Sequence, residues 1–149
     1  MRMIAALTGL VALAIPGLAC AAEASPKATL SCEVVENGGR TKLPVKGGIR
    51  IDEPVECKVS VAGAARPEPF AARIVTTWTE YTDARKKVPK KSDRLTGQVN
   101  GGAPWTATLE ADKDFVGCLD FVIEAVLTAP GAAKPAWSKK LQVKAFCPD

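Results

Sequence analysis

Residues 55–63 read VECKVSVAG, and the order of apolar and polar residues in this stretch decides the fold class. Every second side chain is apolar, and those between them are charged or polar. The apolar set is Val55, Cys57, Val59 and Val61. A period of two residues is typical of a β-strand that packs one face on a core and exposes the other face to water.

The same alternation recurs on both sides of this strand. It appears in ATLSCEVV (28–35), GIRI (48–51), FAARIVTTWTEY (70–81), LTGQVNGG (95–102), WTATLEA (105–111), CLDFVIEAVLT (118–128) and WSKKLQVKAFC (137–147). Turn residues separate these segments, as in ENGG (36–39) and APGAAKPA (129–136), and helical period is nearly absent. About seven short strands without a helix predict an all-β fold, an antiparallel β-sandwich.

The first residues predict export from the cell. Arg2 precedes an apolar run over 4–15, and a segment of small residues follows that run. This pattern predicts a cleaved signal peptide over 1–21 and a mature domain over 22–149. The apolar run is shorter than the roughly 20 residues that a membrane helix needs, and no second run follows. We therefore expect a periplasmic or secreted domain without a transmembrane segment.

A lipid anchor at Cys20 is the alternative to simple cleavage. In that case Cys20 would become the acylated first residue of the mature chain. Bacterial lipoproteins place Leu three residues before this Cys, whereas Gly17 stands there and Leu18 is one place late. An A-x-A pattern formed by Ala19 and Ala21 fits cleavage before Ala22 instead.

Four further cysteines predict two disulfides, because an oxidising compartment forms and preserves them. They are Cys32, Cys57, Cys118 and Cys147. A zinc site is not expected, since the chain has neither a C-x-x-C pair nor any His. The cysteines flank two turn-containing segments symmetrically, and this spacing favours pairing Cys32 with Cys57 and Cys118 with Cys147.

The order of these residues also resembles the immunoglobulin-like fold. Cys57 lies on a B-like strand, Trp78 on a C-like strand, and Cys118 opens an F-like strand. Val116, in place of Tyr, stands two residues before Cys118, and Trp78 lies farther from Cys57 than in antibody domains. The resemblance implies a second pairing, Cys57 with Cys118 between the sheets and Cys32 with Cys147 between the first and last strands.

The absence of His excludes Ser-His-Asp and Cys-His catalytic sites and any metal site with His ligands. We predict no catalytic, cofactor-binding or metal-binding residues, and a protein that is not an enzyme. The alternative is a small enzyme or enzyme inhibitor that uses exposed loops, with the carboxylates of Glu110, Asp112 and Asp114 as its candidates. Asp is also a frequent turn residue, and we favour that interpretation.

Three tryptophans raise the question of a sugar-binding platform. Trp78, Trp105 and Trp137 each alternate in step with apolar residues of their own segment. Large aromatic side chains supply much of the buried area of a small domain. We therefore expect all three in the core or at its edge.

The densest charge cluster is DARKKVPKKSDR, residues 83–94. Its six basic residues are Arg85, Lys86, Lys87, Lys90, Lys91 and Arg94. Pro89 predicts a loop or a frayed edge here, and we favour a solvated edge whose charges oppose sheet-to-sheet aggregation. The alternative is a polyanion site for phosphate-bearing glycans, anionic lipid headgroups or an acidic protein face. No aromatic residue interleaves the charges, and the net charge is only +4, so no specific nucleic-acid partner is expected.

These observations predict an exported, non-enzymatic binding or structural domain of the cell envelope or secreted fraction. The basic loop 85–94 is its candidate contact with an unknown protein or anionic surface.

Overall fold

The computed structural model describes residues 25–147, so the predicted signal peptide and Cys20 lie outside the described residues. Eight strands build the domain, and their bounds follow in chain order. They are β1 (Ala28–Glu36), β2 (Gly39–Lys42), β3 (Val55–Val61), β4 (Phe70–Tyr81), β5 (Lys87–Val99), β6 (Trp105–Leu109), β7 (Phe121–Thr128) and β8 (Trp137–Val143). No helix in the described part of the chain is long and apolar enough to cross a membrane.

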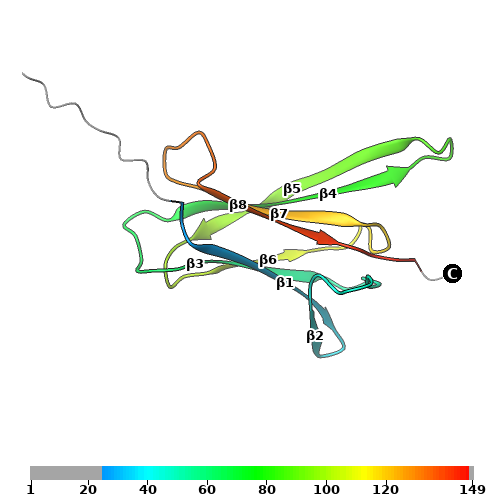
Figure 1. Cartoon of the computed structure of the whole chain (residues 1–149), viewed down its shortest axis with the longest axis horizontal. Coiled ribbons are helices and arrows are strands. Elements are labelled where there is room, and N and C mark those ends of the chain that lie inside the picture. The colour runs from blue at the N-terminus through cyan, green and yellow to red at the C-terminus, as the bar shows by residue number, and fades with distance from the viewer. Residues whose placement is uncertain (1–24, 148–149) are drawn as a thin grey trace, which may run out of the picture.

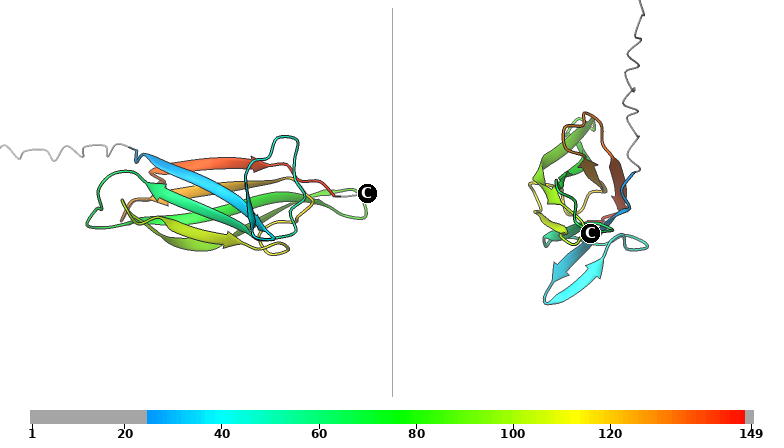
Figure 2. Two further views of the ribbon diagram at one scale, coloured as in Figure 1. Left: turned by 90° about the horizontal axis from the view of Figure 1, so that it is seen from below. Right: turned by 90° about the vertical axis from the view of Figure 1, so that its left-hand side faces the viewer.

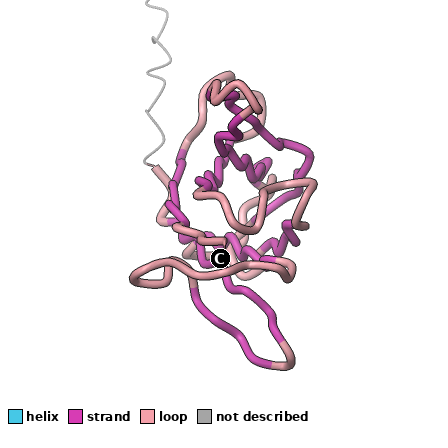
Figure 3. Tube along the Cα trace, turned by 90° about the vertical axis from the view of Figure 1, so that its right-hand side faces the viewer, coloured by secondary structure: helices cyan, strands magenta, loops and turns pink. Residues whose placement is uncertain are grey.

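The strands form two four-stranded antiparallel sheets that pack face to face (Figure 1). One sheet has the order β2-β1-β3-β6, and the other has the order β5-β4-β7-β8. The predicted antiparallel β-sandwich is therefore confirmed, with eight strands where the sequence predicted about seven. Seen along the strands, the magenta strands enclose the interior, while β2 and the adjoining end of β1 project away from it (Figure 3).

The alternating residues of β3 lie in the interior of the first sheet. β3 pairs with β1 on one side and with β6 on the other. Val55, Cys57 and Val59 are fully buried, as their alternation predicts. Cys32 lies directly opposite Cys57 in the β1–β3 register and forms a disulfide with it, with the two Cα atoms 4.1 Å apart.

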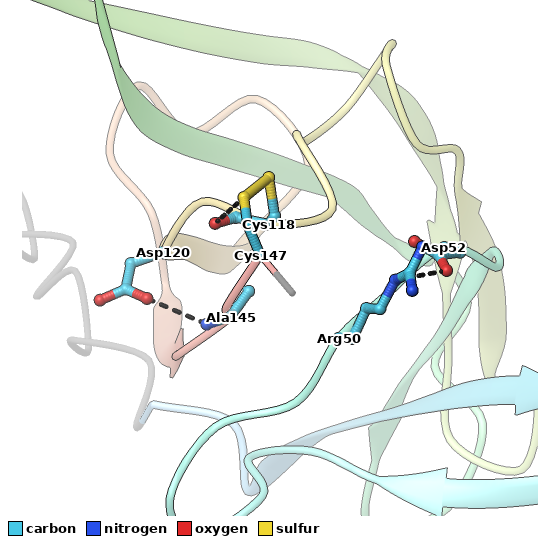
Figure 4. Close-up of a disulfide and its surroundings, with 6 residues drawn as sticks. All are labelled: Arg50, Asp52, Cys118, Asp120, Ala145 and Cys147. Atoms are coloured by element: carbon cyan, nitrogen blue, oxygen red, sulfur yellow. Dashed lines mark hydrogen bonds and ion pairs between the residues drawn. A yellow bond between two sulfur atoms is a disulfide. The ribbon is translucent and has the colours of Figure 1, made fainter. Parts of the chain in front are cut away.

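A second disulfide, between Cys118 and Cys147, closes one end of the domain (Figure 4). It joins the segment before β7 to the segment after β8. Beside it, Asp120 Oδ1 accepts a hydrogen bond from the Ala145 backbone N–H at 2.9 Å. The structure thus contains the pairing that the sequence spacing favoured, and not the pairing implied by the immunoglobulin-like resemblance.

The core lies between the sheets and includes aromatic residues from a loop as well as from strands. Phe115, in the β6–β7 connection, stacks on Phe121 of β7 with ring centroids 4.7 Å apart. Both rings are buried, and Phe70 and Ile74 of β4 belong to the same cluster. The β6–β7 connection therefore contributes an aromatic ring to the core.

Trp105 of β6 closes the border between the two sheets against Gly97 of β5. A Cβ atom built at Gly97 would lie 2.3 Å from the indole Nε1 of Trp105. The indole ring therefore occupies the space that any other residue at position 97 would need.

Gly97→Ala is expected to lower the free energy of unfolding by about 1 to 3 kcal/mol, because overpacking displaces a neighbouring side chain. Urea unfolding measures the change. Gly39→Ala is the matched control, since its added Cβ meets only a backbone oxygen at 3.4 Å. An equal loss in both variants would contradict the steric explanation.

The hairpin of β4 and β5 reaches past the ends of the other strands (Figures 1 and 2). These are the longest strands of the described domain, with 12 and 13 residues. The C-terminal segment ends on the same side of the molecule, whereas β1 begins at the opposite end. The hairpin tip is therefore the part of the domain that projects farthest at this end.

Candidate functional site

The structure corrects the prediction of a basic loop over 85–94. β5 begins at Lys87 and pairs with β4 along its whole length, so most of the basic residues lie on a strand. This strand is the outer edge of its sheet, and its other side has no hydrogen-bonded neighbour among the described strands. An edge position accommodates Pro89, whose missing N–H would interrupt a ladder in the middle of a sheet.

The tip of the hairpin is a tight turn over 82–86. The Arg85 backbone N–H donates to Thr82 O at 2.7 Å, and the Thr82 N–H donates to Lys86 O at 3.0 Å. The Lys86 N–H also donates to Thr82 Oγ1 at 3.2 Å. Arg85 has a φ of 56°, a left-handed conformation that glycine adopts more readily than arginine.

Three cations belong to this turn and the start of β5, and the turn also contains one acid, Asp83. Arg85, Lys86 and Lys87 are exposed, and within residues 25–147 none of them forms an ion pair. Tyr81 stands opposite Lys87 in the β4–β5 register and is 62% exposed. We call Tyr81 and these three cations the basic tip.

The other three basic residues of the predicted cluster are already paired. Lys90 Nζ lies 3.6 Å from Glu80 Oε2, and Lys91 Nζ lies 3.0 Å from Asp93 Oδ2. The hydrogen bond from Lys91 holds the pKa of Asp93 below its ordinary value. These pairs lie along the edge strand and fit the interpretation of a solvated, charged edge.

Arg94, the last candidate residue of the polyanion site, forms an ion pair within the domain. Its guanidinium binds the buried carboxylate of Asp114 through both Nε, at 2.9 Å, and Nη2. The Asp114 side chain is completely buried, while that of Arg94 is 45% exposed. The hydrogen bond to Asp114 raises the pKa of Arg94. Arg94 therefore ties β5 to the β6–β7 connection.

The Asp114 carboxylate has two further partners. Ser92 Oγ donates to Oδ1 at 2.6 Å, and the Glu110 backbone N–H donates to Oδ2 at 2.9 Å. The Asp114 carbonyl oxygen also accepts a hydrogen bond from the hydroxyl of the buried Thr76. This carboxylate is thus a structural anchor between the edge strand and a loop.

The remaining carboxylates of the enzyme alternative do not converge on a site. Glu110 forms an ion pair with the neighbouring Lys113, and the hydrogen bond from Lys113 lowers the pKa of Glu110. Asp112 occupies a turn with a φ of 65°. Neither of them, nor Asp114, lines the main surface hollows of the described domain. The described residues also contain no group of three or more His, Cys, Asp or Glu side chains able to hold a metal ion.

The three tryptophans do not form a surface platform. Trp78, Trp105 and Trp137 are all partly buried and pack against the core cluster, as their alternation predicts. The Trp78 indole N–H donates to Glu80 Oε1 at 2.9 Å. Tyr81 and Phe146, which is 51% exposed, are the large hydrophobic side chains most open to solvent in the described chain.

A hollow of about 550 Å³ adjoins the basic tip on the outer face of the second sheet. It crosses all four strands of that sheet. Its lining is Thr77, Trp78, Thr79, Pro89, Lys90, Lys91, Asp120, Phe121, Val122 and Gln142. The alternation that places Trp78 inward also places Thr77, Thr79 and Tyr81 together on the outer face, which was the sequence signal for this surface.

No protein-family model matches the sequence, and none of the curated proteins resembles it significantly. The geometry and charge of the basic tip and its adjoining hollow therefore carry the functional proposal.

Arg85→Gly is expected to raise the free energy of unfolding by up to about 1 kcal/mol, because glycine relieves the left-handed backbone at little steric cost. The same variant removes one cation of the basic tip and should weaken its binding to anions. Chemical unfolding and binding to an anionic polymer measure the two effects. A loss of stability would show that the arginine side chain holds the turn together.

Proposed function

We propose that this domain is an exported binding protein that recognises an anionic partner through the basic tip. The observation that carries the proposal is the group of three unpaired cations at the end of the projecting hairpin. Cations on the rest of β5 are neutralised by Glu80, Asp93 and Asp114. Selective neutralisation along the strand leaves the positive charge concentrated at its tip.

The compartment supports an extracellular or periplasmic role. Disulfides form and persist in an oxidising environment, and the domain contains two of them. The predicted signal peptide would deliver the chain to such a compartment. The first of them is fully buried between paired strands, so it is part of the fold and not a surface redox site.

The architecture suits a binding domain of the immunoglobulin-like class, which we propose on the strand order. The order β5-β4-β7-β8 corresponds to C′-C-F-G, and the neighbours β1 and β3 correspond to A and B. In such sandwiches, loops and hairpins at the ends of a rigid scaffold carry the recognition surfaces. The basic tip is the connection between the C-like and C′-like strands.

Backbone strain at the tip also supports a role for its side chains. Glycine would suit the left-handed position of Arg85 better, yet an arginine occupies it. A residue held in an unfavourable conformation at an exposed turn leads to a hypothesis of function.

Binding of the mature domain to polygalacturonate, a linear polyanion, tests the proposal. The triple variant Arg85→Gln, Lys86→Gln, Lys87→Gln should lose affinity by about tenfold or more. Each exposed ion pair contributes modestly to the binding free energy, and this variant removes three of them. Affinity of the unmodified domain should also fall steeply as salt rises, because the Debye length shrinks from about 10 Å at 0.1 M to about 3 Å at 1 M.

The matched control removes three exposed cations elsewhere, Lys58, Lys134 and Lys139, by the same change to Gln. None of these three has an ion pair among the described residues. The control should retain its affinity. If it loses as much as the tip variant, binding depends on net charge and the basic tip is not a site.

A further inference from the structure

We infer that the hollow beside the basic tip is a sugar-binding groove, so that the anionic partner is a linear acidic polysaccharide. This inference rests on the proposed function and names its ligand class. The groove differs from the basic tip in its chemistry, because hydroxyl and amide groups are prominent in its lining.

The groove presents uncharged hydrogen-bonding groups that the protein itself does not use. The side chains of Thr77, Thr79 and Gln142 project from β4 and β8 toward the outer face, and they make no hydrogen bond within the described domain. Hydroxyl and amide groups can donate and accept, which matches the hydroxyls of a sugar ring. Pro89 and Val122 supply small apolar surfaces between them.

The groove continues beyond its first hollow. Gln142 also borders a second hollow of about 280 Å³, whose lining includes Pro44, Val45, Lys46 and Lys144. The path from β5 to β8 crosses three strand spacings, roughly 14 Å in all. A path that extends across four strands suits a chain molecule better than a compact ligand.

Positive charge stands at both ends of this path. The basic tip lies at the β5 end, and Lys46 and Lys144 lie beyond β8. Neither Lys46 nor Lys144 has an ion pair within residues 25–147. The one carboxylate in the lining, Asp120, already accepts a hydrogen bond from the Ala145 backbone. A polymer with repeated acidic groups can meet both ends at once.

Tyr81 lies on the same face of β4 as Thr77 and Thr79, two residues beyond Thr79 of the groove lining. An exposed aromatic ring offers an apolar face on which a sugar ring can stack, with its hydroxyl in water. An acidic protein would instead need an apolar core within an interface of roughly 800 Å² per partner. Phe121 is buried and Trp78 packs against the core, so these two large residues of the lining leave only a small apolar surface, and this favours a glycan over a protein.

The experiment compares two polyanions, polygalacturonate and poly-L-glutamate, on the same mature domain. The groove variant Thr79→Val, Gln142→Met keeps side-chain size but removes the hydrogen-bonding groups. Its affinity for polygalacturonate should fall about tenfold, the effect of losing two hydrogen bonds of ordinary strength, while its affinity for poly-L-glutamate stays unchanged. Thr106→Val, Thr108→Val on the outer face of β6 is the matched control and should change neither.

The outcomes separate this inference from the proposed function. If the groove variant binds polygalacturonate as well as the unmodified domain does, the glycan inference is overturned while tip binding stands. Equal affinity of the unmodified domain for both polymers at matched charge also overturns it. If the triple tip variant binds both polymers normally, or neither polymer binds at all, the proposed function itself fails. A melting temperature within a few degrees of the unmodified domain confirms that each variant is folded.

Discussion

Replacing Cys32 and Cys57 with alanine is expected to lower the free energy of unfolding by about 3 to 4 kcal/mol, the value of the chain-entropy model for a loop of this length. The two cysteines are 25 residues apart and fully buried, and they join directly opposed positions of β1 and β3. Losing the sulfurs also leaves unfilled space in the core. The total is a large part of the roughly 5 to 15 kcal/mol that stabilises an ordinary domain.

The other disulfide is the natural comparison. Cys118 and Cys147 close a loop of similar length, with a separation of 29 residues, but Cys147 is exposed. A mild reductant should therefore open Cys118–Cys147 first, and the domain should remain folded until the buried pair is reduced. Denaturant unfolding of the two alanine variants, with mass spectrometry during reduction, measures both effects. If the variant of the buried pair unfolds at the same denaturant concentration as the unmodified domain, the Cys32–Cys57 link does not stabilise the sandwich.

Asp114→Ala is expected to destabilise the domain by about 2 to 4 kcal/mol, somewhat below the usual cost of breaking a fully buried ion pair because Arg94 can turn into water. The substitution removes the acceptor for Ser92, Arg94 and the Glu110 backbone N–H. It also loosens the connection that carries Phe115 into the core. Urea unfolding measures the loss.

Asp93→Ala provides the control for this prediction. Asp93 has the same charge and also pairs with a cation, but its side chain is 54% exposed. Its loss should leave the unfolding curve close to that of the unmodified domain, because exposed ion pairs contribute little. Equal destabilisation in the two variants would contradict the role of burial at Asp114.

The alternation of apolar and polar residues predicted the strands whose inward side chains are apolar. It failed for segments in which apolar and polar residues do not alternate. β2 has no apolar residue and was not predicted. Its hairpin with β1 relies on the turn residues Asn37 and Gly38, both with positive φ, and on Arg40, which binds Glu33 and Glu56 across the sheet. For the basic stretch the sequence predicted a loop or a frayed edge, and residues 87–99 form one long edge strand.

The candidate site was only partly predictable. The six basic residues stood out in the sequence, but their division into paired and unpaired cations depends on where Glu80, Asp93 and Asp114 lie in space. Asp114 is 20 residues from Arg94 along the chain, and no local pattern marks such a contact. The groove draws on β4, β5, β7 and β8, so its hydroxyl and amide groups come together only when the sheet forms.

The most direct test of the central claim is to map the bound polymer on the domain by NMR. Backbone amide signals are followed while polygalacturonate is added to the mature protein at low salt. We expect the shifts to be concentrated at the basic tip, residues 81–87, and along the groove at Thr77, Thr79, Val122 and Gln142. The outer face of the β2-β1-β3-β6 sheet should remain unchanged. Shifts centred on that opposite sheet, or none at saturating polymer, would contradict the assignment of the basic tip as the binding site.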